Sequence, residues 1–230
     1  MGSVTMQRLI SLLVRALVLF TAFPVHESAH ALSAHWMGDD TAKNQGRISL
    51  NPFRHINLFG ALFMLFAGVG AANPVPIDPR NFKKPKAGMA LSSLAGPMSN
   101  LMLAYLSMIV YRVLFIVYYE NFSADFSAQS DVMVILLYIF QYGALLNIGL
   151  AVFNLLPIPP LDGSRILTLF LPEEKYFGIM KYEKYIFGIL FVLIISGILN
   201  KPLAFLQDFA ADALFSLTSW VDNIVYLFLR

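Results

Sequence analysis

The chain has 230 residues, of which 58% are hydrophobic and only 13% are charged, and its mean hydropathy is +0.67. A soluble globular domain carries about 25% charged residues, so this composition excludes a soluble protein. It also excludes a disordered chain, which needs low hydrophobicity and high net charge. The net charge of +2 gives no support for nucleic-acid binding. We therefore expect an integral membrane protein with several spans.

The apolar stretches predict an all-α polytopic membrane protein with about four to six transmembrane helices, since a span needs about 20 mostly apolar residues. The candidate spans are residues 9–36, 88–119, 132–156 and 185–199, the last extended to 205. Residues 202–230 contain Asp208, Asp212 and Asp222 among apolar residues. This leaves open whether that stretch spans the membrane or lies in its interface.

Residues 58–72 are apolar but too short for an ordinary span, and three glycines interrupt them. The loops on both sides, 39–57 and 73–87, are basic, and basic loops face the cytoplasm. A re-entrant segment leaves both loops on that side, whereas a span would separate them. Residues 120–131 contain three acids and no Lys or Arg, as expected of an external loop. We predict a short re-entrant segment after the first helix, with a β-hairpin-like form as an open alternative.

Residues 26–30, HESAH, have the pattern HExxH at the end of the first predicted span. On a helix, His26 and His30 share a face, so both imidazoles can point at one cation. Glu27 lies beside that face, where it can take a proton from a metal-bound water. The chain has only four His, and ionisable residues inside a membrane segment are costly unless they are functional. The pattern therefore predicts a metal site with Glu27 as its base.

A catalytic zinc usually has three protein ligands and one open position. Because the chain has no cysteine, the ligands must supply nitrogen or oxygen. The better candidate for the third ligand is Asp162, which follows three prolines and starts a tight Asp-Gly turn. If residues 58–72 are re-entrant, Asp162 arrives on the same membrane face as the HExxH pair. His35 and His55 are better explained as structural or loop residues.

The motifs of residues 9–165 resemble the site-2 protease family of intramembrane zinc metalloproteases, peptidase family M50. They are HESAH at 26–30, NP at 51–52, NPVP at 73–76, AGPMSN at 95–100 and NLLPIPPLDG at 154–163. The resemblance implies one zinc ion per chain, held by His26, His30 and Asp162, with Glu27 as the base. It also implies that Asn154 binds the substrate.

The same resemblance implies cleavage of a membrane-protein substrate helix within the lipid bilayer, in a multi-pass protein of the cell membrane with its active site near the cytoplasmic face. The loops at 73–88 and 120–131 are too short for a PDZ or CBS domain, which indicates a compact form of the family. We divide the chain into a catalytic membrane core, residues 1–165, and C-terminal membrane helices, residues 166–230, of the same membrane domain.

Three alternatives stay open at this stage. A catalytically silent membrane protein could bind client helices, although the intact HExxH and Asp162 argue against it. A metal or proton transporter could use the same intramembrane groups as a pathway, although no internal repeat is visible. The N-terminal apolar run also resembles a signal peptide, but Arg15 interrupts it. The substrate and the oligomeric state do not follow from the sequence.

Overall fold

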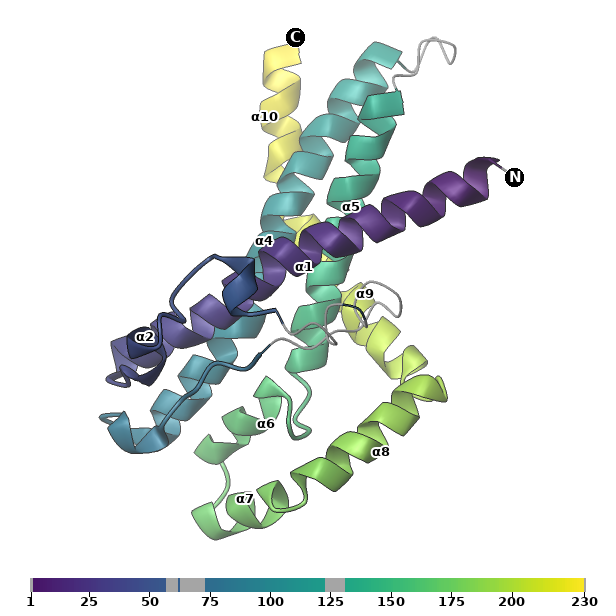
Figure 1. Ribbon diagram of the computed structural model, residues 1–230. Coiled ribbons are helices and arrows are strands. Elements are labelled where there is room, and N and C mark those ends of the chain that lie inside the picture. The colour runs from purple at the N-terminus through teal and green to yellow at the C-terminus, as the bar shows by residue number, and fades with distance from the viewer. Residues whose placement is uncertain (1, 57–61, 63–72, 123–130, 230) are drawn as a thin grey trace.

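A computed structural model describes residues 2–56, 62, 73–122 and 131–229 of the chain, and every regular element among them is a helix (Figure 1). The predicted all-α architecture is therefore confirmed for the part of the chain that is described. The α-helices are α1 (Gly2–Met37), α2 (Thr41–Asn44), α4 (Pro85–Phe122), α5 (Asp131–Asn154), α6 (Asp162–Ile166), α7 (Glu173–Met180), α8 (Glu183–Ile195), α9 (Asn200–Leu217) and α10 (Trp220–Leu229). Short 3-10 helices lie at Pro52–Arg54, Pro79–Asn81 and Leu167–Leu169.

Three of the described helices are long and apolar enough to cross a membrane: α1 over Ser11–Met37, α4 over Pro85–Glu120 and α5 over Val132–Asn154. They match the first three predicted spans of ordinary length. Helices α8 and α9 form a fourth candidate if they are one broken span. The described residues thus hold three candidate spans, below the predicted four to six, or four if the broken pair counts as one span, which is the lower limit of that range. Residues 58–72, apart from Leu62, lie outside the described part of the chain, so the re-entrant segment stays a prediction.

The stretch predicted as one span, residues 185–205, is instead broken between α8 and α9, which meet at 85°. Gly197 lies in the break with a φ of +74°, a left-handed backbone conformation that glycine adopts without steric cost. Asn200, Lys201 and Pro202 follow within five residues, and proline is tolerated in the first turn of a helix but disfavoured in its interior. The break therefore has a sequence signal, which the predicted extension to residue 205 passes over. Residues 202–229 likewise divide into α9 and α10.

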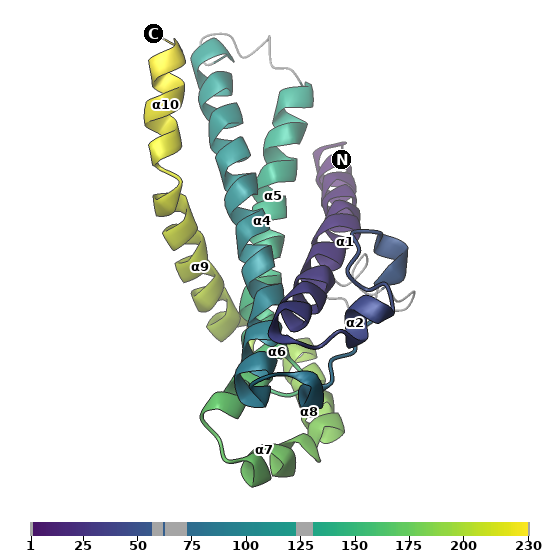
Figure 2. The ribbon, with the colours of Figure 1, turned by 90° about the vertical axis from the view of Figure 1, so that its left-hand side faces the viewer.

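Helices α4 and α5 run side by side, and α1 crosses them obliquely (Figures 1 and 2). Val14, Val18, Ala22 and Phe23 of α1 are buried at this crossing against apolar side chains of α4 and α5. Ala22, like Ala104, Ala144 and Ala151, is fully buried. Small residues at such interfaces let helix backbones approach closely where lipid removes the usual hydrophobic driving force. The crossing brings the second half of α1 against α4.

The C-terminal helices α9 and α10 lie along α4 (Figure 2), and Arg112 of α4 joins them to it. Arg112 is only 6% exposed. Its Nε donates to the Thr218 hydroxyl at 2.9 Å, its Nη2 donates to the Phe215 carbonyl at 2.6 Å, and its Nη1 pairs with Asp222. The guanidinium carbon lies 3.8 Å from the centre of the Phe215 ring. Asp222 of α10 is therefore paired with a buried arginine of α4, which explains one of the three acids in this apolar stretch.

Replacing Arg112 by leucine is expected to destabilise the protein by about 2–3 kcal/mol, because it leaves Asp222 and two oxygens without their donor. The value is below that for a fully buried pair because the Asp222 side chain is 38% exposed. Asp222→Asn should cost less, because the asparagine oxygen can still accept from Arg112 and the hydrogen bonds of Arg112 to Thr218 and Phe215 remain. Unfolding by denaturant in detergent measures both. Equal midpoints for Arg112→Leu and wild type would contradict this role of Arg112.

Candidate metal centre

Three side chains from two distant parts of the chain meet at one point. His26 and His30 lie on α1, and Asp162 is the first residue of α6. The Nε2 atoms of the two histidines are 3.0 Å apart, and they lie 3.2 and 3.3 Å from Oδ2 of Asp162. In the described part of the chain this is the one group of three His, Asp or Glu residues arranged to hold a metal ion. The structure thus brings the predicted ligands together.

The spacing of these donor atoms fits zinc. A tetrahedral zinc site with bonds of about 2.0–2.1 Å places its donors roughly 3.3 Å apart. The observed separations of 3.0, 3.2 and 3.3 Å are close to that value. Two imidazole nitrogens and one carboxylate oxygen are a donor set found in catalytic zinc sites, in which the fourth position stays open. The residues present therefore fit one zinc ion.

A backbone carbonyl of α4 orients one of the two imidazoles. His30 Nδ1 lies 2.7 Å from the carbonyl oxygen of Ser92. Because that oxygen can only accept, Nδ1 carries the proton and Nε2 is left with a free lone pair for a metal. A ligating histidine usually has such a partner on its other nitrogen. The sequence gives no signal for this contact, because every residue has a backbone carbonyl and the identity of Ser92 does not matter.

Gly96 of α4 packs directly against both histidines. A Cβ atom at this position would lie 2.3 Å from Nε2 of His30 and 2.7 Å from Cε1 of His26. Only glycine lets the α4 backbone approach the metal face this closely. The close contact between α4 and the two imidazoles therefore depends on this glycine.

The position of Asp162 is set by a compact turn after α5. The N–H of Leu161 donates to the Ile158 carbonyl at 2.9 Å, and the Ser164 hydroxyl donates to the Leu161 carbonyl at 2.7 Å. A Cβ on Gly163 would lie 2.2 Å from the Leu155 carbonyl oxygen, so the turn folds back onto the end of α5. Burial raises the pKa of Asp162, but the imidazoles of His30 and His26 outweigh it and hold that pKa below its ordinary value. The carboxylate is therefore available as an anionic ligand.

Glu27 is 8% exposed and follows His26 directly on α1. Its Oε2 accepts a hydrogen bond of 3.2 Å from the backbone N–H of Val75. Val75 belongs to residues 73–78, an irregular segment that precedes the 3-10 helix Pro79–Asn81. This contact orients the Glu27 carboxylate through one of its two oxygens.

The histidines outside the cluster have structural contacts. His55 is fully buried and its Nε2–H donates to the Ser49 carbonyl at 2.7 Å. The same carbonyl accepts from the Ser28 hydroxyl at 2.5 Å, which attaches this loop to the metal-binding turn of α1. His35 pairs with Asp40 near the surface. These positions agree with the structural roles expected from the sequence.

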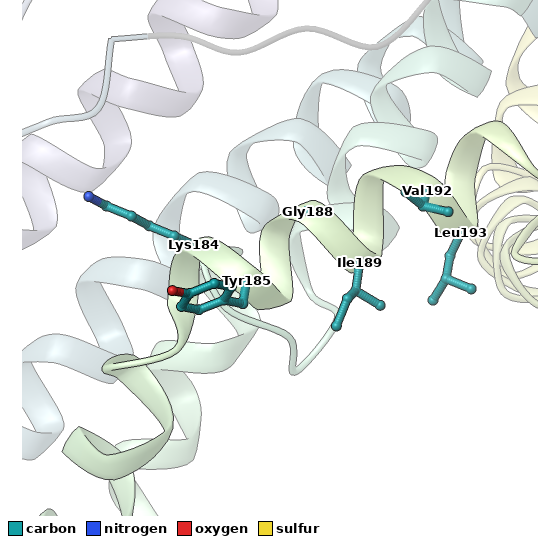
Figure 3. Close-up of a pocket in the computed structure, with 6 residues that line it drawn as sticks. All are labelled: Lys184, Tyr185, Gly188, Ile189, Val192 and Leu193. Atoms are coloured by element: carbon teal, nitrogen blue, oxygen red, sulfur yellow. The ribbon is translucent and has the colours of Figure 1, made fainter.

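Asn154 is the last residue of α5, is partly buried and lies outside the metal cluster. Its predicted contact with substrate is not tested by the structure and stays a prediction. A shallow, mostly apolar groove lies elsewhere, along α8 (Figure 3). None of its six lining residues belongs to the metal cluster: Lys184, Tyr185, Gly188, Ile189, Val192 and Leu193.

A helical membrane protein with two histidines of an HExxH pattern, a distant aspartate and a glutamate beside them has the features of a membrane zinc metalloprotease. Comparison with known proteins agrees with this class. Residues 14–197 match the model of peptidase family M50, and the chain belongs to that family. It is thus a member of a zinc metalloprotease family.

Two relatives illustrate the similarity. The chain is 38% identical over 203 residues to YwhC of Bacillus subtilis, covering 88% of this chain and 90% of that protein. It is 30% identical over 180 residues to Rip2 of Mycobacterium tuberculosis, covering 76% of this chain but only 64% of that protein. Both relatives are named as candidate zinc metalloproteases. No solved structure matches the chain.

Proposed function

We propose that the protein is an intramembrane zinc metalloprotease that hydrolyses peptide bonds in transmembrane segments of other membrane proteins. In this proposal His26, His30 and Asp162 hold one zinc ion, Glu27 transfers protons, and the site faces the cytoplasmic side. The observation that carries the proposal is the meeting of the three ligand atoms within 4.8 Å of one another, with Glu27 adjacent on α1.

The chain's own groups suit peptide hydrolysis. A zinc ion bound by His26, His30 and Asp162 would be the Lewis acid for activation of water and polarisation of the scissile carbonyl. Glu27 takes the proton of the attacking water and returns it to the leaving amine nitrogen. Its Oε2 accepts a hydrogen bond from the Val75 N–H, and we assign the proton transfer to Oε1. The Ser92 carbonyl keeps His30 in one tautomer while this happens.

Substrate must reach the site in an extended form, because the carbonyls of an intact helix are occupied by its own hydrogen bonds. Residues 73–78 run beside Glu27 and contain Pro74 and Pro76, which have no N–H. An extended substrate strand can donate its N–H groups to carbonyls of this segment, as in strand addition. Asn154, at the end of α5, is our candidate for a further substrate contact.

Purified protein in detergent or bilayers tests the proposal. We expect one zinc per chain and cleavage of a peptide with a transmembrane sequence. Removal of zinc by a chelator should abolish cleavage, and added zinc should restore it. Zinc-loaded protein that binds but never cleaves such helices would favour a silent client-binding protein. Metal flux into liposomes would favour a transporter, and a wild-type protein without zinc would contradict the metal site.

A further inference from the structure

Asp39 is a fully buried carboxylate outside the metal cluster, two residues after the end of α1. Its Oδ1 accepts from the Thr41 N–H at 3.0 Å, the Thr41 hydroxyl at 2.5 Å and the Asn81 side-chain amide at 2.9 Å. Its Oδ2 accepts from the Asp78 N–H at 2.8 Å. Burial raises the pKa of Asp39, but the hydrogen bonds from Asn81, Thr41 and Asp78 lower it below its ordinary value. The Asp39 carboxylate is therefore an anion that accepts hydrogen bonds both from Thr41 and from residues 78–81.

These bonds fasten one end of segment 73–78 to α1. The N–H of Lys83 adds a bond of 3.3 Å to the carbonyl of Met37, the last residue of α1. Gly38 makes the turn with a φ of +111°, and a Cβ there would lie 3.2 Å from the Asn81 carbonyl oxygen. The end of α1 and residues 78–83 are thus in close contact around Asp39.

The other end of segment 73–78 is fastened as well. The N–H of Asn73 donates to the His55 carbonyl at 2.7 Å, and Nη2 of Arg47 donates to the Asn73 carbonyl at 2.5 Å. Between the two ends, the N–H of Val75 meets Glu27. Three extended residues span at most about 10 Å, so a shift of Asp78 is transmitted to Val75 through a short stretch of chain that is held at both ends.

We propose that Asp39 is a positioning residue for proteolysis, which holds segment 73–78 against α1 so that the Val75 N–H orients the Glu27 carboxylate. The inference rests on the proposed function of Glu27. Asparagine at position 39 can offer only one carbonyl oxygen, so either Asp78 or the Thr41 and Asn81 donors lose their acceptor. A displacement of the order of 1 Å near reacting groups can cost about 10²-fold in rate.

The chain supplies a matched control at the next residue. Asp40 has the same charge, but its side chain is 53% exposed and pairs with His35. We expect Asp39→Asn to lower kcat at least tenfold on a transmembrane test peptide, with KM and zinc content within twofold of wild type. Asp40→Asn should keep kcat within twofold. Asn81→Ala, which removes one donor to Asp39, should lower kcat by a smaller factor than Asp39→Asn and is the second variant if the first folds poorly.

Amide hydrogen exchange at Val75, Ile77 and Asp78, the residues of 75–78 that have an N–H, gives a readout that does not depend on activity. We expect faster exchange in Asp39→Asn than in Asp40→Asn. Equal kcat in these two variants, or equal exchange, would overturn the role of Asp39, and so would a loss of zinc together with activity. If wild-type protein holds zinc but cleaves nothing, the proposed function fails, while exchange at residues 75–78 still decides whether Asp39 holds the segment.

Discussion

Replacing Glu27 by glutamine is expected to lower kcat for peptide hydrolysis by about 10²–10⁴-fold, the usual contribution of a general acid–base group. The amide cannot take a proton from water or return it to the leaving nitrogen. It still offers an oxygen to the Val75 N–H, through which Glu27 contacts segment 73–78. Zinc content is expected to stay at one per chain, because His26, His30 and Asp162 are unchanged. Single-turnover cleavage and metal analysis of the same preparation measure the two quantities.

Glu120→Gln is a suitable control, because this substitution removes the same charge from an exposed residue near the C-terminal end of α4. It should cleave at the wild-type rate. Cleavage by Glu27→Gln at more than a tenth of the wild-type rate would mean that another group moves the proton. Loss of zinc from Glu27→Gln would instead mean that Glu27 supports the metal site itself.

The ligands could be predicted because each depends on a local rule. His26 and His30 are four residues apart, and helical geometry alone places them on one face. Asp162 stands in a turn that three prolines and a glycine specify. Assigning Asp162 to the same site as the two histidines depended on topology, because the HExxH pair and Asp162 had to lie on one face of the membrane. The observed distances of 3.2 and 3.3 Å agree with that step.

The supporting contacts could not be predicted, because they depend on the register between helices. The Ser92 carbonyl and Gly96 touch the histidines through backbone atoms of α4, more than 60 residues away in sequence. Asp39 was not distinguished from its neighbour Asp40 by residue type, although one is fully buried and the other exposed. The pairing of Arg112 with Asp222 joins residues 110 positions apart. Sequence periodicity within one helix contains no information on such contacts.

Helix boundaries show the same division. The ends of α4 and α5 lie close to the predicted ends, because a proline at 85 and the Pro157–Pro160 region interrupt the apolar runs. The break between α8 and α9 is marked by Gly197 and by the sequence Asn-Lys-Pro at 200–202, but glycine and proline in an apolar run are also compatible with one kinked helix. Hydropathy identifies membrane segments well, but it does not determine where they bend.

Replacing Gly96 by alanine is expected to weaken zinc binding by about 10–100-fold, although no ligand is removed. Losses of this size are found when residues that orient a metal ligand are mutated. The added Cβ would lie 2.3 Å from Nε2 of His30. That imidazole cannot simply turn away, because its Nδ1–H is bonded to the Ser92 carbonyl one turn earlier on the same helix. Either this hydrogen bond breaks or α4 moves, and both displace a metal-binding nitrogen. Competition with a chelator of known affinity measures the loss.

Gly143→Ala on α5 separates this effect from the general cost of a methyl group between helices. A Cβ at Gly143 would meet only the Ser107 hydroxyl, at 4.0 Å, which is ordinary contact. We expect its zinc affinity to equal that of wild type and its stability to be unchanged or to rise by up to about 1 kcal/mol, since alanine is the better helix former. If Gly96→Ala also kept wild-type affinity, α4 would have to move off the metal face without cost. Its packing against α5 and its hydrogen bond to His30 argue against such a movement.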